Sequence, residues 1–514
     1  MYNLSTVLES SARERPEHTA FILGNRRFSY AETNAAANMI ANGLAAHGVG
    51  AGDTVALSCP NLPYFPMIYF AVLKTGATIL PVNVLLTPDE ISYLLNDSGA
   101  KAYFCFEGTA DLPMGQAGHT AFGRADKCEN FWVITGDPAA ASPIDGTKTL
   151  GALMANQSPV FETVQRDGDD VAVVLYTSGT TGHPKGAELT HTNIVLNAVV
   201  ARDLLSSKGD DVCMLTLPLF HVFGQVVLMV ACTMVGVTMV LVPRFEPGAV
   251  LKSLQDDGVT IFAGVPTMYW ALLHHPADGV DLDKIKNTLR VCGSGGASLP
   301  VEVLRGFEDK FEVPILEGYG LSETSPVVTF NHPHKERKPG SVGTPVWGVE
   351  VRVVDENDQD VPVGDPGEVI VRGHCVMKGY LNKPEETAEA FRGGWFHTGD
   401  IAQFDDDGYL YIVDRVKDMI IRGGFNVYPR ELEEVLVTHP DVSLAAVIGV
   451  PDDQYGEEIK AFVVPKPDHK IDTDGLIEWS KQHLAAYKYP RFVEVREALP
   501  MNATGKILKK ELRA

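Results

Sequence analysis

The sequence has few cysteines and no recognisable arrangement of them. The chain has 514 residues and seven cysteines, at positions 59, 105, 128, 213, 232, 292 and 375. They are scattered, odd in number and never form a C-x-x-C pair. This spacing argues against a disulfide framework and against a zinc site, and it predicts a reducing, cytoplasmic location.

Positive charge is also scarce. The chain has 43 Lys and Arg residues against 66 Asp and Glu residues, which gives a formal net charge of −23 at pH 7. Such a surface repels the phosphates of nucleic acids, so we exclude a nucleic-acid partner. An anionic substrate must therefore meet positive charge that is local to its site.

We expect neither a leader sequence nor a membrane-spanning run. The N-terminal stretch MYNLSTVLESSARERPEH has no apolar centre, so we expect no signal peptide. The longest charge-free run covers residues 212–243, and its continuous apolar part is shorter than the roughly 20 residues that cross a bilayer. The residues that interrupt it are Pro218, His221, Gly224, Gln225 and Gly236. We expect a buried helix followed by a buried strand here, and no transmembrane segment.

The most distinctive stretch is a loop rich in glycine and hydroxyl groups, which reads YTSGTTGHPKG over residues 176–186. It follows the apolar run 171–175, which predicts a buried parallel strand. Glycines let a ligand approach closely, hydroxyls and backbone N–H groups donate hydrogen bonds, and lysine adds a mobile charge; a polyphosphate needs all three. The pattern G-x-x-x-x-G-K-[ST] occurs nowhere in the chain, so phosphate binding here uses another arrangement. The candidate ligands are Thr177, Ser178, Gly179, Thr180, Thr181, Gly182 and Lys185.

This loop resembles the phosphate-loop signature of the adenylate-forming superfamily, which contains acyl-CoA synthetases, luciferases and peptide-synthetase adenylation domains. The similarity extends over nearly the whole chain, and long-chain fatty acid CoA ligases are the relatives it resembles most. The resemblance implies two steps at one site. A carboxylate attacks the α-phosphorus of MgATP and releases pyrophosphate, and the CoA thiol then attacks the acyl-adenylate and releases AMP. ATP, Mg²⁺, CoA and a carboxylic acid are the implied ligands, and Thr180 is among the implied catalytic residues.

Helix and strand signals alternate along most of the chain and predict an α/β fold with helices on both faces of mostly parallel sheets. Capping boxes at Ser29–Glu32 and Thr87–Glu90 predict two helix starts. Residues 107–168 give no clear signal. Short β segments between Pro-Gly and Asp-Gly turns predict a small β subdomain over about residues 340–414.

The last hundred residues form a separate compositional unit with α+β patterning. A charged stretch at residues 414–418 precedes it and has the composition of a linker. We therefore predict a large N-terminal domain over residues 1–414, a hinge at 415–417 and a small mobile C-terminal domain over 418–514. By resemblance, Lys417 occupies the hinge position, where relatives have aspartate or lysine.

Residues 317–323, EGYGLSE, combine glycine, an aromatic ring and an acid in one loop. A tyrosine can stack on a purine, and Glu323 can hold magnesium against a triphosphate, although a turn with a packed tyrosine would look the same. By resemblance, Tyr319 and Ser322 contact the AMP moiety and Glu323 contacts the metal. The family usually has threonine where Ser322 stands, and either hydroxyl can serve. Glu317, Gly318 and Gly320 complete the nucleotide-binding candidates in this loop.

Two further stretches are assigned to the nucleotide. Ser298, in GGAS (295–298), is the predicted N-cap of a helix, and the resemblance places Gly296 and Ala297 in the adenine pocket. In WFHTGD (395–400), Asp400 follows a tight turn and is suited to bonding both ribose hydroxyls. The resemblance gives that role to Asp400 and to Arg415.

His221 is the histidine that the resemblance selects from fifteen. Without context it reads as a buried, satisfied histidine. The resemblance places it beside the carboxylate substrate, where its ring orients the attacking oxygen. The candidate walls of an apolar acyl pocket are Phe220, Phe223, Val227, Phe262, Val265, Pro266 and Met268, and each has spacing equally typical of a core residue.

Lys506 ends the loop PMNATGK, residues 500–506, near the end of the sequence. A lysine on such a loop can reach into an interdomain cleft and stabilise charge that develops on the carboxylate and the α-phosphate, although alone it would read as part of a solvated tail. The resemblance makes Lys506 the lysine of the adenylation step. It also places Gly423 and Gly424 on a loop that lets the pantetheine arm of CoA pass.

These features predict an ATP-dependent acyl-CoA synthetase for a medium- or long-chain fatty acid. An aromatic-acid CoA ligase and a fatty acyl-AMP ligase that delivers to a carrier protein are the enzyme alternatives. A catalytically silent acyl or nucleotide sensor is the non-enzyme alternative. The sequence leaves acyl length and the formation of a homodimer open.

Overall fold

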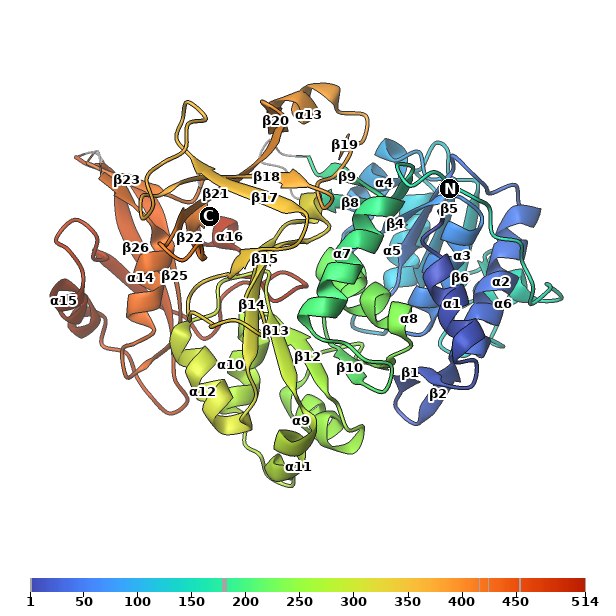
Figure 1. Ribbon diagram of the computed structural model, residues 1–514, viewed down its shortest axis with the longest axis horizontal. Helices are drawn as coiled ribbons and strands as arrows, with labels where there is room; N and C mark the ends of the chain where they lie inside the picture. The colour runs from blue at the N-terminus through green and yellow to red at the C-terminus, as the bar shows by residue number, and fades with distance from the viewer. Residues whose placement is uncertain (1, 178–182, 416, 424, 453, 514) are drawn as a thin grey trace.

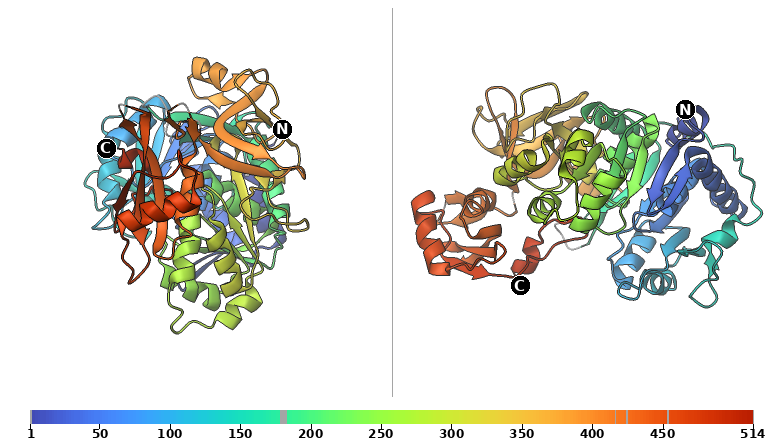
Figure 2. Two further views of the ribbon diagram at one scale, coloured as in Figure 1. Left: turned by 90° about the vertical axis from the view of Figure 1, so that its left-hand side faces the viewer. Right: turned by 90° about the horizontal axis from the view of Figure 1, so that it is seen from below.

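The computed structural model describes residues 2–177, 183–415, 417–423, 425–452 and 454–513 (Figure 1). Two large sheets, a small β sheet and a C-terminal sheet form the molecule. Figure 1 shows the first large sheet at the right, the second at the centre and the C-terminal sheet at the left. In the right-hand view of Figure 2 the C-terminal unit stands out as a separate body at one side.

The first large sheet has eight strands with a parallel centre. They are β3 (Thr54–Ser58), β4 (Thr78–Pro81), β5 (Ala102–Phe106), β6 (Asn130–Ile134), β7 (Lys148–Thr149), β8 (Val171–Thr177), β9 (Lys185–Thr190) and β19 (Gly379–Tyr380). Their order is β19-β9-β8-β4-β3-β5-β6-β7. The strands from β8 to β7 in this order pair in parallel, and β9 and β19 add an antiparallel edge.

The second large sheet has nine strands and the same plan. They are β1 (Thr19–Leu23), β2 (Arg26–Ser29), β10 (Val212–Leu215), β11 (Thr238–Leu241), β12 (Ile261–Gly264), β13 (Val291–Ser294), β14 (Ile315–Gly320), β15 (Val327–Phe330) and β16 (Thr344–Pro345). Their order is β16-β15-β14-β13-β12-β10-β11-β1-β2, and only the outer strands are antiparallel. The predicted fold class, helices and mostly parallel sheets, is confirmed.

Helices lie between the two large sheets and outside each of them. The largest core contains residues of both sheets and of α1 (Thr6–Glu14), α2 (Tyr30–Ala46), α3 (Tyr64–Lys74), α6 (Leu150–Met154), α7 (His191–Leu204), the π-helix η1 (Phe223–Val230) and α8 (Ala231–Val235). Every residue of α3 from Phe65 to Lys74 is buried, as expected of a helix packed on both sides. Separate cores hold α4 (Pro88–Asp97) and α5 (Met114–Phe122) on the first sheet, and α9 (Pro247–Asp256), α10 (Pro266–His274), α11 (Leu282–Thr288) and α12 (Val301–Phe311) on the second.

A third sheet follows the second in the chain. Its strands are β17 (Val349–Val354), β18 (Gly367–Gly373), β20 (Phe391–Arg392), β21 (Trp395–Phe404) and β22 (Leu410–Arg415), and the helix α13 (Pro384–Ala390) precedes β20. Its antiparallel pairing fits the predicted β subdomain. The predicted hinge begins where β22 ends, and Lys417 lies in an exposed turn.

The C-terminal unit has its own core. Its sheet consists of β23 (Ile420–Arg422), β24 (Phe425–Val427), β25 (Val442–Asp452), β26 (Gly456–Pro465) and β27 (Phe492–Val495), with helices α14 (Pro429–Leu436), α15 (Thr473–His483) and α16 (Lys509–Leu512). Its fold is α+β, as predicted. The placement of the domain boundaries and of the hinge stays a prediction.

Several local predictions can be checked directly. Both capping boxes are present: the Ser29 hydroxyl accepts from the Glu32 N–H and the Thr87 hydroxyl from the Glu90 N–H. In the charge-free run, the helices η1 and α8 precede β11, as expected, and β10 begins the run. Within the described part of the chain, no helix is both long and apolar enough to reach across a bilayer.

One prediction fails, and one stretch without a clear signal contains regular elements. Residues 107–168, which gave no clear signal, contain α5, β6, β7 and α6, because their strand and helix residues are short runs between long polar loops. Ser298 is not a helix N-cap, since α12 begins three residues later, at Val301, with Pro300 at the N-cap position. The intervening residues continue the loop after β13 instead.

Candidate active site

The loops that follow β12, β13 and β14 meet at the carboxyl edge of the second sheet. A Cβ atom built on Gly295 would lie 3.2 Å from the ring of Phe223 and 3.4 Å from the carbonyl oxygen of Gly318. On Gly296 it would lie 3.5 Å from Val265 Cγ1. Ligands of open α/β sheets gather at this edge, so the observed contacts bring four predicted site residues to the expected place.

Gly320 shows why glycine is needed in this loop. A Cβ atom there would lie 1.7 Å from the carbonyl oxygen of Pro326, which no side chain can tolerate. Ser322 begins the single 3-10 turn η2 (Ser322–Thr324) just after it. Gly296 and Ala297 are exposed at the mouth of the neighbouring loop, where a ligand can reach them.

The phosphate loop is flanked by Thr177 and Lys185. Thr177 ends β8 and pairs with Lys185 at the start of β9. The candidates Ser178, Gly179, Thr180, Thr181 and Gly182 lie outside the described residues. The Thr177 hydroxyl donates to Glu323 Oε1 at 3.1 Å, which places the turn η2 beside the end of the first sheet. Thr177 and Glu323, two predicted site residues, are therefore in direct contact, and their roles stay predictions.

Asp400 lies in a buried polar cluster. Its Oδ2 accepts from the Tyr319 hydroxyl at 2.6 Å, and its Oδ1 lies 3.0 Å from Arg415 Nε. Burial, together with the nearby Asp400 carboxylate, raises the pKa of Tyr319 well above its usual value. Asp400 in turn raises the pKa of Arg415. Three residues assigned to AMP by resemblance thus form one hydrogen-bonded group.

An irregularity in β21 directs Asp400 toward this cluster. The pairing of β18 with β21 shifts register between Glu368 and Ile370, so that extra residues of β21 bulge out of the ladder. Gly399 has a φ of +70° there, and its N–H donates to Glu368 Oε1 at 3.1 Å. Glu368 Oε2 lies 2.9 Å from His397 Nδ1. The carboxylate of Glu368 therefore anchors the bulge that carries Asp400.

Lys506 of the C-terminal unit reaches the same region. The Thr267 hydroxyl donates to the carbonyl oxygen of Gly505 at 3.2 Å, and a Cβ atom on Gly505 would lie 3.0 Å from Val265 Cγ2. The loop that carries Lys506 is thus docked on the start of α10. Burial and the positive charge of Arg415 lower the pKa of Lys506 to about 8.

His221 lies two residues before η1. Its Nδ1 accepts from the Phe223 N–H at 3.3 Å, so in the neutral ring the proton is on Nε2. Burial and the charge of Lys506 lower the pKa of His221 to about 4. The ring is therefore neutral at pH 7 and offers an N–H donor.

The predicted acyl walls divide between two cores. Phe220, Phe223, Val227, Val265 and Met268 are buried in the core between the large sheets, and Pro266 is the first residue of α10. The interpretation of Phe262 as a wall residue is wrong. This residue packs in the core outside the second sheet, with its ring 5.4 Å from that of Tyr269, because neighbouring residues of a strand point to opposite faces.

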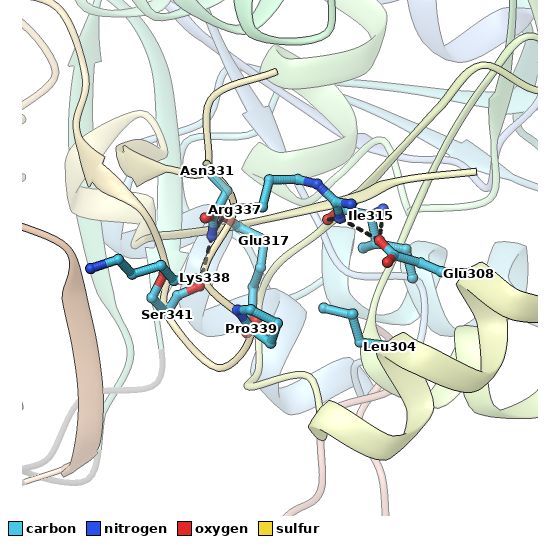
Figure 3. A pocket seen from close by; sticks show the side chains of 9 residues that line it. All are labelled: Leu304, Glu308, Ile315, Glu317, Asn331, Arg337, Lys338, Pro339 and Ser341. Carbon is cyan, nitrogen blue, oxygen red and sulfur yellow. Dashed lines mark hydrogen bonds and ion pairs between the residues drawn. The ribbon is translucent and has the colours of Figure 1, made fainter. Parts of the chain in front are cut away.

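Glu317 lies beside a small cavity of about 50 Å³ (Figure 3). Residues lining the cavity are Leu304, Glu308, Ile315, Glu317, Asn331, Arg337, Lys338, Pro339 and Ser341. Glu317 Oε1 accepts from the Leu299 N–H at 2.9 Å, whereas Oε2 has no partner among the described residues. Burial raises the pKa of Glu317 to about 7, and Arg430 opposes that shift.

The candidate Gly423 lies away from this group. Gly423 stands in the turn of the β23–β24 hairpin, with a φ of +58°, and its N–H donates to the carbonyl oxygen of Tyr455 at 2.8 Å. Gly424 lies outside the described residues. The structure also adds residues that the sequence did not indicate, namely Thr267, Glu368 and Tyr380. No motif marks them, since only tertiary pairing brings them to the site.

Comparison with known proteins identifies the family. The model of the AMP-binding enzyme family matches residues 8–381, and the model of the AMP-binding enzyme C-terminal domain matches residues 431–506. Feruloyl-CoA synthase of Amycolatopsis sp is 39% identical over 98% of this chain and 96% of its own length. The long-chain-fatty-acid–CoA ligase of Bacillus subtilis (strain 168) is 36% identical over 99% of this chain and 94% of its own.

A solved structure agrees with these relatives. The anthranilate CoA ligase AuaEII, in complex with anthranoyl-AMP, superposes with a TM-score of 0.91 and 31% identity, covering 100% of this chain and 96% of that one. The resemblance to the adenylate-forming superfamily is confirmed. The chain belongs to the AMP-binding enzyme family and is an adenylate-forming acyl-CoA ligase.

Proposed function

We propose that this ligase activates an apolar monocarboxylic acid at the place where Lys506 meets the loops of the second sheet. The docking of Gly505 against Val265 and Thr267 supports this placement most strongly, because it brings the loop that carries Lys506 beside a predicted acyl wall. The influence of Asp400 and Arg415 on the pKa of Lys506 puts its ammonium group near the proposed ribose ligands.

Each side chain then has a role in the first step. The neutral His221 ring donates from Nε2 to the substrate carboxylate and orients the attacking oxygen. Lys506 stabilises the negative charge that develops on the α-phosphate and the carboxylate. Asp400 accepts from the ribose hydroxyls, and Arg415 and Tyr319 hold its carboxylate in place. No covalent nucleophile is required, so catalysis comes from positioning and charge neutralisation.

The residues around Glu323 fit a magnesium ion bound with the nucleotide. Glu323 is 9% exposed, and its carboxylate lies beside the Thr177 hydroxyl at the edge of the phosphate loop. Mg²⁺ in nucleotide sites takes one or two carboxylates together with phosphate and water oxygens, which this arrangement offers. When bound, the ion would neutralise charge on the phosphates. Glu323 would hold it, and Lys185 and the loop 177–182 would hold the phosphates.

We assign the second step to the same site. We propose that the C-terminal unit swings about residues 415–417, which replaces the Lys506 loop by the hairpin that carries Gly423 and Gly424. Gly423 has a left-handed φ, which favours glycine at this position, and a glycine places no side chain in the turn. The pantetheine arm of CoA would pass there.

The pH dependence of ATP capture should follow Lys506. Its pKa, about 8, lies below the ordinary lysine value of 10.5, and only the protonated amine stabilises the developing anion. kcat/KM for ATP should therefore be highest below pH 8 and fall about tenfold per pH unit above it, because kcat/KM reports the free enzyme. In the control Lys506→Arg, whose guanidinium does not titrate in this range, the fall near pH 8 should disappear. A wild-type profile that stays flat from pH 7 to pH 10 would contradict the assignment.

The proposed acid is a medium- or long-chain fatty acid. The predicted wall runs from His221 along η1 into the core between the two large sheets, and the buried residues Phe223, Val226 and Val227 of η1 are apolar. An apolar wall of this kind favours a ligand with an extended apolar tail. The similarity to the long-chain-fatty-acid–CoA ligase supports the same class.

A phenylpropenoic acid is the second candidate. The feruloyl-CoA synthase of Amycolatopsis sp supports it, at an identity similar to that of the fatty acid ligase. The test is AMP release with CoA and a panel of aliphatic acids of increasing length, benzoate, cinnamate and ferulate. kcat/KM should be at least about tenfold higher for the best aliphatic acid than for ferulate, since a few additional buried methylene groups are worth that much. The reverse order would replace the first candidate by the second.

A further inference from the structure

Tyr380 lies on a short strand that joins the two halves of the proposed nucleotide site. Strand β19 pairs antiparallel with β9, and Tyr380 stands opposite Ala187, next to the strand end that leaves the phosphate loop. On the other side of the same segment, the Met377 N–H donates to the carbonyl oxygen of Glu323 at 2.8 Å. The segment therefore fixes the distance between the first sheet and the turn that carries Glu323.

The side chain of Tyr380 contacts two predicted ligands of MgATP. Its hydroxyl donates to Glu323 Oε1 at 3.1 Å, and the Thr177 hydroxyl donates to the same oxygen at the same distance. Lys185 Nζ lies 5.3 Å from the centre of the Tyr380 ring, within the range of a cation–π contact. One half-buried tyrosine thus touches the carboxylate assigned to the cation and the ammonium group assigned to the phosphates.

We propose that Tyr380 is a positioning residue that orders the Glu323 carboxylate for the divalent cation of the nucleotide and keeps Lys185 beside it. This inference rests on the proposed role of Glu323. Two donors on one carboxylate oxygen restrict rotation of the group, so that it need not be ordered when the cation arrives. Without the Tyr380 hydroxyl, only Thr177 would donate to this oxygen. The carboxylate would then lose rotational freedom when the cation binds, and this loss would weaken cation binding.

The hydroxyl is not needed to hold the strand. The backbone N–H of Tyr380 donates to Thr387 Oγ1 at 2.9 Å, and the pairing with β9 fixes the other side. Replacing tyrosine by phenylalanine leaves these bonds and the ring contact with Lys185 intact. The variant Tyr380→Phe should therefore fold with an unchanged melting temperature.

The test compares ATP binding with and without Mg²⁺ by calorimetry. In Tyr380→Phe, affinity for ATP without Mg²⁺ should stay within about twofold of wild type. The gain in affinity caused by Mg²⁺ should fall roughly ten- to hundredfold, as expected when a hydrogen bond to a charged group is lost. The matched control is Tyr64→Phe, whose hydroxyl donates at 3.1 Å to the backbone oxygen of Gly136. It should bind as wild type does.

Two further variants separate the possible failures. Tyr380→Leu also removes the ring, so ATP affinity without Mg²⁺ should fall as well. Glu323→Gln should lose most of the gain from Mg²⁺. Suppose that Glu323→Gln loses this gain. If Tyr380→Phe then keeps the gain, or if Tyr380→Phe loses ATP affinity equally with and without Mg²⁺, the inference is overturned and the role of Glu323 stands. If Glu323→Gln keeps the full gain, both the role of Glu323 and the inference fall.

Discussion

Replacing Lys506 by alanine should reduce adenylation by about two to three powers of ten, which is typical of the loss of one preorganised electrostatic group. The reason is its place in the molecule. Lys506 is carried on a loop docked against Val265 and Thr267, and its ammonium group is close enough to Arg415 and Asp400 for their charges to shift its pKa. The measurement is acid-dependent exchange of pyrophosphate into ATP. Thioester formation from chemically supplied acyl-adenylate and CoA should change by less than about tenfold, since that step does not use Lys506.

The control for this result is Lys510→Ala, a substitution in α16 close to Lys506 in the chain. It should leave both half-reactions within about twofold of wild type, as expected of a surface change. Pyrophosphate exchange at the wild-type rate in Lys506→Ala would refute the catalytic assignment. Equal losses in both half-reactions would show that the loop has a general structural role instead.

Replacing Asp400 by asparagine should have the second largest effect. Asp400 is 3% exposed and accepts from the hydroxyl of Tyr319, and it pairs with Arg415. The substitution removes the charge of a buried carboxylate that both Arg415 and Tyr319 contact, and it weakens the proposed acceptor of the ribose hydroxyls. We expect kcat/KM for ATP to fall at least about a hundredfold, with a smaller change in KM for the acid.

An exposed aspartate of the same sheet region provides the comparison. Asp360 lies 2.6 Å from Arg352 Nε, and its side chain is 67% exposed. Pairs of this kind contribute about 0–1 kcal/mol, so Asp360→Asn should leave kcat/KM for ATP within about twofold of wild type. Should Asp400→Asn have no larger effect than this variant, the ribose assignment would be wrong.

The elements that the sequence predicted well are those with strong local signals. The apolar run 171–175 marked β8, because buried parallel strands read as continuous apolar stretches. The helix starts at Ser29 and Thr87 were marked by capping boxes, which depend on residues three positions apart. Ser298 is a residue type common at N-caps, but no capping box accompanies it. The loop after β13 continues past Ser298, and α12 begins at Val301.

From the sequence, only residues that lie in local motifs could be assigned to the proposed site. Tyr319, Asp400 and Arg415 come from three separate stretches, and the structure joins them by one hydrogen bond and one ion pair. Tyr380 and Thr267 have no motif, because strand pairing and docking of the C-terminal unit bring them there. Phe262 was misplaced because its spacing in the sequence is that of a wall residue and of a core residue alike. The sequence leaves the identity of the acid open for a similar reason, since fatty and aromatic acids both need an apolar wall.

A crystal structure of the protein with a non-hydrolysable acyl-adenylate analogue would show where the nucleotide and the acid bind. We predict that the ribose hydroxyls lie within hydrogen-bonding distance of Asp400, the phosphate beside Lys506, and the acyl chain along η1. An analogue bound elsewhere, with Asp400 still bonded only to Tyr319 and Arg415, would contradict this prediction.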